Sequence, residues 1–409
     1  MTVGAMADEA LAHGFDLRSL SPGFLNDPYP TYHALRTHDP VRRMPDGSLF
    51  LTRYDDLVTV YRNTKLFSSD KRAEFGPKFG PGTPLYQHHT GSVVFSDPPR
   101  HTRVRRLLTG ALSQRALADT EPALIELVDA LLDRAAGLGR FDLIEDYAAL
   151  IPVEVIGNLL GVPRERREPL RAWSLAILGA LEPVQTPAQL QRGTEALLAF
   201  RPFMQELIED RRRNPGDPWR DTLTRLIKGE GADRMTEDEL IENCIFLLNA
   251  GHDTTSGFIG NALTTLLDWP DQRARLLEDH SLIRMGLEEF LRFESGNQFG
   301  SRVSTGTGEI GGVAFGPGQQ ITLCIGAANR DPAAFEEPDR LDLARWPNRH
   351  MAFGYGVHLC AGLSLARLEG RVAIGRFLER FPGYRIDGPV VRGGRARVRG
   401  FLSVPVAVE

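Results

Sequence analysis

The sequence predicts a mainly α-helical protein with a small β-rich region. Apolar residues recur at helical spacing over 124–132 and 197–208, which is typical of helices that pack in a bundle. Residues 302–325 instead indicate strands, with a turn at Gly316-Pro317-Gly318. We expect the 409 residues to form one domain. It would comprise an N-terminal extension at 1–23 and β-rich portions at about 40–55, 300–326 and 384–409.

The composition excludes several classes of protein. Hydrophobic residues make up 42% and charged residues 25%, as in ordinary globular proteins. The net charge of 48 − 53 = −5 argues against a general nucleic-acid binder. The three cysteines have no paired metal spacing, which is typical of a reducing compartment. Residues 1–20 contain no long apolar run, so we expect neither signal peptide nor membrane anchor, and a cytoplasmic monomer.

The N-terminal part alternates short elements with a long loop. Pro45-Asp46-Gly47 before an apolar triplet indicates a hairpin. Residues 68–93 carry many glycines and prolines, with aromatic residues between them, and predict a long irregular loop. Such loops often bind ligands, although a solvent-exposed loop with aromatic anchors remains the alternative.

A helix is expected next, over 97–108, with Asp97 as its cap and Pro98 as its first residue. His101 and Arg105 are four residues apart and therefore share one helical face. Two cationic donors on one face suit a carboxylate. A solvated basic face is the alternative.

The longest predicted helix covers 237–268, with a capping box from Thr236 and Glu239, and ends at Trp269-Pro270. Its middle reads L-N-A-G-H-D-T-T. Gly251 costs a helix interior about 1 kcal/mol relative to alanine. Asp253 and the threonines after it compete for backbone hydrogen bonds. Residues that disfavour a helix, placed inside an otherwise periodic helix, indicate a functional site. A buried kink is the alternative.

The most informative stretch is 353–362, F-G-Y-G-V-H-L-C-A-G, which places Cys360 before a helix expected over 363–377. The helix start stabilises a thiolate, which is a nucleophile or a metal ligand. His358 is a poor candidate for a catalytic base, because side chains two residues apart tend to diverge. A thiolate bound axially to haem iron fits better. A buried structural cysteine is the alternative.

These motifs resemble those of the cytochrome P450 family of haem-thiolate monooxygenases. The pattern F-G-x-G-x-H-x-C-x-G is matched at every fixed position, A-G-x-D-T matches from Ala250, and Glu289 with Arg292 forms ExxR. The likeness spans roughly residue 25 to the C-terminus. It implies the P450 fold, a helical bundle with a small β-rich region, and haem b as cofactor.

The resemblance also assigns roles to individual residues. Cys360 would bind the iron, while Asp253 and Thr254 would deliver protons to bound dioxygen. Glu289, Arg292 and Arg345 would form a structural lock beneath the haem. The residues expected around the haem are His101, Arg105, Ala250, Gly251, Arg302, Phe353, Gly354, His358, Cys360 and Gly362.

The implied reaction inserts one oxygen atom of O2 into a substrate by hydroxylation, epoxidation or dealkylation. The chain has no G-x-G-x-x-G dinucleotide loop, so NAD(P)H would act through a separate ferredoxin and ferredoxin reductase. Arg100, Arg103 and Arg106 are expected to be available to an acidic redox partner. A peroxide-driven peroxygenase and a non-catalytic haem sensor are the alternatives, and the Asp253-Thr254 pair argues against both.

The helix face before Ala250 offers no lysine or arginine. The sequence therefore favours a mostly apolar or aromatic small molecule as substrate. The expected pocket residues are Phe75, Phe79, Leu178, Phe246, Asn249, Phe299 and Phe401.

Overall fold

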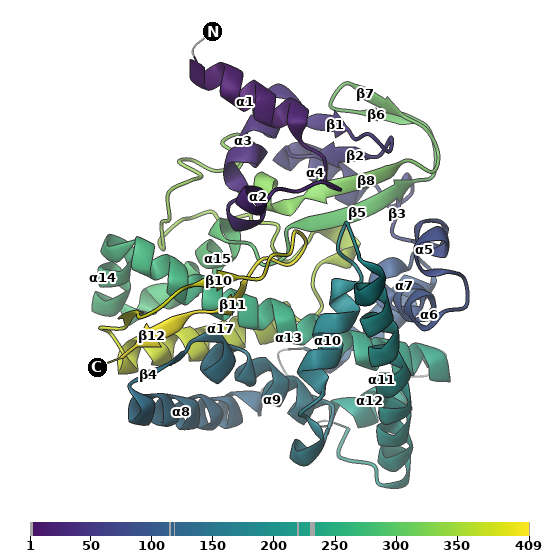
Figure 1. Ribbon diagram of the computed structural model, residues 1–409. Coiled ribbons are helices and arrows are strands. Elements are labelled where there is room, and N and C mark those ends of the chain that lie inside the picture. The colour runs from purple at the N-terminus through teal and green to yellow at the C-terminus, as the bar shows by residue number, and fades with distance from the viewer. Residues whose placement is uncertain (1–2, 114–115, 118, 219–220, 230–233, 409) are drawn as a thin grey trace. The chain divides into compact units, whose positions relative to one another are not determined.

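The computed structural model describes residues 3–113, 116–117, 119–218, 221–229 and 234–408 (Figure 1). Residues 1 and 2 of the expected extension and residue 409 lie outside this part. The chain divides into two compact units. The first unit comprises Met1–Ser69, Asn261–Cys360 and Val391–Leu402, and the second comprises Asp70–Gly260, Ala361–Val390 and Ser403–Glu409. The expectation of one domain stays a prediction.

Helices dominate both units, so the prediction of a mainly α-helical protein is confirmed. The α-helices of the first unit are α1 (Val3–Gly14), α2 (Pro22–Asn26), α3 (Tyr29–His38), α4 (Tyr54–Arg62), α14 (Pro270–Glu278), α15 (Ile283–Phe293) and α16 (Ile325–Ala328). Those of the second unit are α5 (Arg72–Phe79), α6 (Pro84–Gly91), α7 (Arg100–Ala111), α8 (Thr120–Leu138), α9 (Leu150–Leu159), α10 (Leu170–Gly179), α11 (Pro187–Arg213), α12 (Thr222–Lys228) and α17 (Leu363–Arg380). Helix α13 (Glu237–Asp268) crosses the division, which falls after Gly260.

The first unit contains a five-stranded sheet with the order β1-β2-β8-β5-β3 (Figure 1). Its strands are β1 (Val41–Arg43), β2 (Leu49–Leu51), β3 (Phe67–Ser68), β5 (Phe299–Ser304) and β8 (Gln320–Cys324). The predicted hairpin is present, because β1 pairs antiparallel with β2. All three residues of β2 are buried, since alternate side chains enter two different hydrophobic clusters. Leu49 and Leu51 join one cluster, and Phe50 joins the other, against Phe299.

The turn expected at Gly316-Pro317-Gly318 is present, since the Gln319 N–H donates to the Gly316 carbonyl at 3.4 Å. It leads from β7 (Val313–Phe315) into β8, which pairs with β2 and β5, so its assignment to a hairpin is wrong. The hairpin consists of β6 (Gly308–Ile310) and β7 and turns at Gly311-Gly312. Gly311 and Gly312 have φ values of 55° and 84°, and the two-residue hairpin turns that match strand twist need such values. Arg302 lies within β5 and precedes this hairpin, as expected.

The remaining strands form small sheets. Strand β12 (Pro405–Ala407) pairs antiparallel with β4 (Arg140–Asp142) and with β9 (Arg385–Ile386) in the second unit. Strands β10 (Val391–Arg392) and β11 (Phe401–Ser403) form a two-stranded ribbon.

Helix α13 follows the predicted bounds. Its capping box is formed, because the Glu239 backbone N–H donates to Thr236 Oγ1 at 3.2 Å and the Thr236 N–H donates to Glu239 Oε2 at 3.0 Å. Pro270 then begins α14. None of the helices in the described part of the chain is both long and apolar enough to cross a bilayer.

Two predictions between residues 68 and 111 are wrong. The expected irregular loop contains the short helices α5 and α6, because Pro84 occupies the first turn of α6 and the Thr83 hydroxyl caps it. Helix α7 begins at Arg100, and its N-cap residue is Pro99 rather than Asp97. Pro98 cannot start this helix, because the proline that follows it disfavours helical backbone angles.

Candidate active site

The stretch around Cys360 forms a tight loop in the first unit. The Cys360 N–H donates to the Phe353 carbonyl at 2.8 Å. Gly354 and Gly356 have φ values of 71° and 68°, which favour glycine. A Cβ atom on Gly356 would lie 2.9 Å from the Tyr61 carbonyl oxygen, so the close packing on α4 also requires glycine there. Gly362 forms the N-cap of α17 in the second unit.

The three cysteines lie in different environments. Cys244 and Cys324 are fully buried, and burial raises the pKa of each thiol to about 12. Cys360 is partly exposed. A thiolate ligand must be both accessible and able to lose its proton. Cys360 therefore meets the first requirement, and Cys244 and Cys324 meet neither.

Two predicted cofactor residues, one in this loop and one in β5, contact side chains from the N-terminal part of the first unit. The ring of His358 hydrogen bonds through Nε2 with Ser69 Oγ at 3.0 Å. Arg302 is 8% exposed, and its guanidinium carbon lies 5.0 Å from the centre of the Tyr61 ring. The sequence analysis missed Ser69 and Tyr61, because each lies more than 200 positions from its partner.

The structure brings Glu289, Arg292 and Arg345 together. Glu289 and Arg292 are both fully buried, and they form two hydrogen bonds of 2.7 and 2.8 Å. Arg345 Nε lies 3.2 and 3.1 Å from the two carboxylate oxygens. The Asp342 N–H and the Asn348 amide donate to the same carboxylate, at 2.9 and 3.1 Å. Sequence reasoning missed these two donors. The trio thus anchors the segment before the cysteine loop to α15.

In the second unit, part of one α13 face is left uncovered. Most residues from 240 to 262 are buried, but Phe246, Ala250, Gly251 and Thr254 are partly exposed. Phe246, Ala250 and Thr254 recur every four residues and therefore share a face. The Thr254 hydroxyl donates to the Ala250 carbonyl at 2.7 Å. The uncovered strip thus includes Ala250, Gly251 and Thr254 of the A-G-x-D-T motif.

Asp253 is 6% exposed and lies on a neighbouring face of the helix. Its negative charge reaches Arg171 of α10, whose pKa is raised by hydrogen bonding to Glu145 and further by the charge of Asp253. Arg171 Nη2 donates to Glu145 Oε1 at 2.6 Å. Glu145 lies in a short π-helix, Ile144–Ala148, and its side chain is 48% exposed. A row of charges therefore leads from the buried carboxylate of Asp253, through Arg171, to the exposed carboxylate of Glu145. This row was not predicted from the sequence.

Helix α7 carries the remaining predicted haem partners. His101 is buried and Arg105 partly exposed, one turn apart. Arg100 and Arg103 each pair with Glu239 Oε1, at 3.1 and 2.6 Å, and each keeps 28% of its side chain exposed. The expectation that they are available to a redox partner stays a prediction.

The predicted pocket residues differ in how far other side chains cover them. Phe75 is 3% exposed and packs against Phe79, His89 and Phe95. Phe299 is 1% exposed and belongs to the core. Asn249 is 1% exposed, and its amide nitrogen and amide oxygen have no hydrogen-bond partner among the residues that the structure describes. The partly exposed members are Phe79, Leu178, Phe246 and Phe401.

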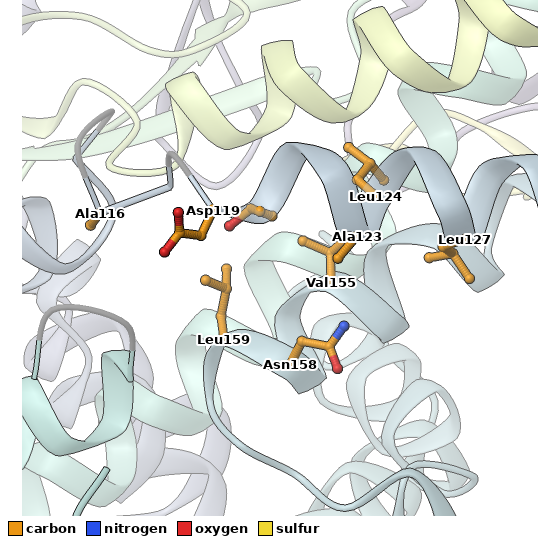
Figure 2. Close-up of a pocket in the computed structure, with 9 residues that line it drawn as sticks. Ala116, Asp119, Ala123, Leu124, Leu127, Val155, Asn158 and Leu159 are labelled. Carbon is orange, nitrogen blue, oxygen red and sulfur yellow. The ribbon is translucent and has the colours of Figure 1, made fainter. Parts of the chain in front are cut away.

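A separate pocket lies between α8 and α9 in the second unit (Figure 2). Its volume is about 200 Å³. Leu124, Leu127, Val155 and Leu159 contribute apolar surface, and Asp119 contributes a carboxylate. None of the residues predicted for the active site lines this pocket.

Comparison with known proteins agrees with these motifs. The cytochrome P450 family model matches residues 181–383. A biotin biosynthesis cytochrome P450 from Bacillus subtilis is 36% identical over 370 residues, which cover 90% of this chain and 92% of the relative. A vitamin D(3) 25-hydroxylase from Pseudonocardia autotrophica is 38% identical over 400 residues, or 94% of each chain.

Solved structures show the same fold. P450BioI in complex with an acyl carrier protein ligated to hexadec-9Z-enoic acid has a TM-score of 0.89 and 33% identity, covering 95% of this chain and 100% of that chain. CYP109E1 from Bacillus megaterium in complex with testosterone has a TM-score of 0.87 and 27% identity, with coverages of 95% and 100%. The chain therefore belongs to the cytochrome P450 family and is a P450 monooxygenase with the P450 fold.

Proposed function

We propose that this enzyme inserts one oxygen atom of O2 into a mostly apolar small molecule, with Cys360 as the iron ligand. The observation that carries this proposal is the accessibility of Cys360. It lies in a glycine-dependent loop that leaves it partly exposed, whereas Cys244 and Cys324 are buried with strongly raised thiol pKa values.

The residues present fit a haem group. Haem would supply the iron chemistry that activates O2, and a thiolate ligand would assist it by donating electron density. Cys360 would hold the iron. Arg302 and His358 in the first unit, and His101 and Arg105 in the second, are the residues that the P450 resemblance assigns to the propionates.

Proton delivery is assigned to Asp253 and Thr254. While Thr254 donates to the Ala250 carbonyl, the lone pairs of its Oγ1 atom still accept hydrogen bonds, for example from water. Asp253, linked by charge to Arg171 and through it to the half-exposed Glu145, would collect protons from solvent. Ala250 and Gly251 leave room on the uncovered strip of α13.

The substrate class follows from the side chains and from the relatives. Phe79, Leu178, Phe246 and Phe401 are partly exposed and apolar. A vitamin D(3) hydroxylase and a testosterone complex are among the relatives, and both involve large apolar molecules. The buried Asn249 amide would bind a polar group of the substrate, because an unsatisfied buried amide costs about 1–3 kcal/mol.

Electrons would come from NAD(P)H through a ferredoxin reductase and a ferredoxin. The absence of a dinucleotide-binding G-x-G-x-x-G loop from the sequence supports a separate reductase.

The test is the absorption spectrum of the reduced protein under carbon monoxide. The wild type should show the red-shifted band of a thiolate-ligated haem, and Cys360→Ser should lose it. Cys244→Ser is the matched control, because it removes a thiol that is buried in the same chain, and it should keep the band. A wild-type spectrum without the thiolate band, or a Cys360→Ser spectrum that retains it, would overturn the proposal.

A further inference from the structure

Asn329 directly follows helix α16 in the first unit, and its side chain is fully buried. The amide nitrogen donates to Ser295 Oγ at 2.7 Å, and the amide oxygen accepts the Met351 N–H at 2.7 Å. Ser295 lies just beyond α15 and donates back to the Leu291 carbonyl of that helix at 2.9 Å. The Asn329 carbonyl accepts from Arg292 Nη1 at 2.8 Å. One buried residue therefore joins the end of α15 to the segment before the cysteine loop.

The hydrogen bonds continue from Met351 into the loop itself. The Met351 carbonyl accepts the Gly354 N–H at 2.8 Å, which closes a turn over residues 351–354. Phe353 lies inside this turn, and its carbonyl accepts the Cys360 N–H at 2.8 Å. The first residue of the turn is thus held by Asn329, and the turn in turn holds the backbone at Cys360.

The structural lock at Glu289 acts on an earlier part of this segment. Among the described residues, its carboxylate reaches along the segment as far as Asn348, three residues before Met351. His350 comes next, and the carboxylate that pairs with it is 24% exposed to water. Asn329 and Met351 are both fully buried, so water cannot replace the bond between them. A buried backbone N–H that loses its acceptor destabilises the structure around it.

We propose that Asn329 is a positioning residue for the Cys360 loop, which fixes where the sulfur lies and how long it stays bound to the iron. This inference rests on the proposed function, in which Cys360 is the iron ligand. Asn329 acts through the backbone of Met351 and Phe353. Hydrogen bonds behind a metal ligand keep the ligand in its productive orientation. A planar amide suits this role, because it presents a donor and an acceptor in fixed directions.

The first test follows the loss of the thiolate band of the reduced protein under carbon monoxide, in buffer without denaturant. Asn261→Ala is the matched control. Asn261 is 1% exposed in the same unit, and its amide also donates to backbone carbonyls, those of Glu294 and Arg399, at 3.4 and 3.2 Å. Asn329→Ala should lose the band at least tenfold faster than Asn261→Ala. General destabilisation would accelerate both alike, so rates within threefold of each other would overturn the inference.

Asn329→Asp is the conservative variant, because a carboxylate oxygen at the same place accepts the Met351 N–H. It should keep the band within threefold of the wild-type rate, even though a buried charge lowers its urea midpoint. Loss of the band as fast as in Asn329→Ala would contradict the role of this oxygen. If Asn329→Ala does not fold, Ser295→Ala carries the test. It removes the support of the amide and should lose the band at least threefold faster than Asn261→Ala, and an equal rate would overturn the inference.

Hydrogen exchange of the holoenzyme tests the same contact without reference to the spectrum. Amides of residues 349–362 should exchange at least tenfold faster in Asn329→Ala than in the wild type, whereas those of α15 should stay within twofold. Unchanged exchange over 349–362 in the folded variant would overturn the inference. Failure of the proposed function is separate, because it appears as a wild-type protein without the thiolate band.

Discussion

The proposed function gives the Thr254 hydroxyl one role in the helix and another in the reaction. Its bond to the Ala250 carbonyl satisfies a donor within α13, and the lone pairs of the same oxygen stay available as acceptors. The neighbouring Thr255 is 4% exposed and lies off the uncovered strip. The two threonines thus differ in exposure because they lie on different faces of α13, not because of their residue type.

Replacing Thr254 by alanine should uncouple electron use from product formation, because proton delivery to bound oxygen loses its hydroxyl. We expect product formation to fall by about 10²-fold, the lower end of what general acid–base groups contribute. Product should be measured against NAD(P)H consumed. Thr255→Ser is the matched control and should stay coupled. A Thr254→Ala enzyme with the product yield of the wild type would contradict the relay.

Helix α17 carries a buried carboxyl group, that of Glu369. The residue is 2% exposed, and its Oε2 atom has no hydrogen-bond partner within the described part of the chain. Burial raises its pKa from 4.5 to about 8. The folded protein therefore retains a proton that the unfolded chain loses above about pH 4.5. Stability should thus decrease as the pH rises from about 4.5 to about 8, by roughly 3–5 kcal/mol in total.

Glu369→Gln should remove this dependence, because an amide is neutral at every pH in the range. Unfolding by urea at pH 5 and at pH 8 measures the effect. The variant should gain stability relative to the wild type at pH 8 and gain much less at pH 5. Glu379→Gln, an exposed position in the same helix, is the control and should leave the pH dependence intact. The same loss of stability with pH in Glu369→Gln as in the wild type would exclude this carboxyl as its source.

Helix α15 carries two adjacent glutamates whose substitution should affect stability differently. Glu289 is fully buried between Arg292 and Arg345, and removing one member of a buried charge group costs about 3–5 kcal/mol. Glu288, whose side chain is 24% exposed, pairs with His350 at 3.0 Å, and a pair that water reaches on one side contributes about 1 kcal/mol or less. Glu289→Gln should therefore lower the urea midpoint and the yield of haem-loaded protein sharply, whereas Glu288→Gln should have little effect. Equal effects of the two substitutions would argue against a structural lock.

The whole molecule requires an external electron source. The enzyme with NADPH alone should form no product, and addition of a ferredoxin and its reductase should start turnover. Hydrogen peroxide without the partners should support far less, because Asp253 and Thr254 suit activation of O2. Peroxide-driven turnover that equals or exceeds the ferredoxin-driven rate would favour a peroxygenase instead.

Local motifs made much of this protein predictable. The bounds of α13 follow from its capping box and from Pro270, because these signals act within a few residues of the helix ends. The loop at Cys360 and its glycines are equally local, so family and cofactor could be inferred from ten consecutive residues. Helices α5 and α6 were not predicted, because many prolines and glycines are typical of an irregular loop and the Thr83 cap was not recognised.

The sequence by itself determined the family, the cofactor and the order of the main elements, because each depends on neighbours in the chain. Only the tertiary structure decided which charges meet. It engaged Arg100 and Arg103 with Glu239 and buried Glu289 between two arginines. The physical reason is that ion pairs and burial depend on distances in space, and these partners are often separated by more than 100 residues of chain.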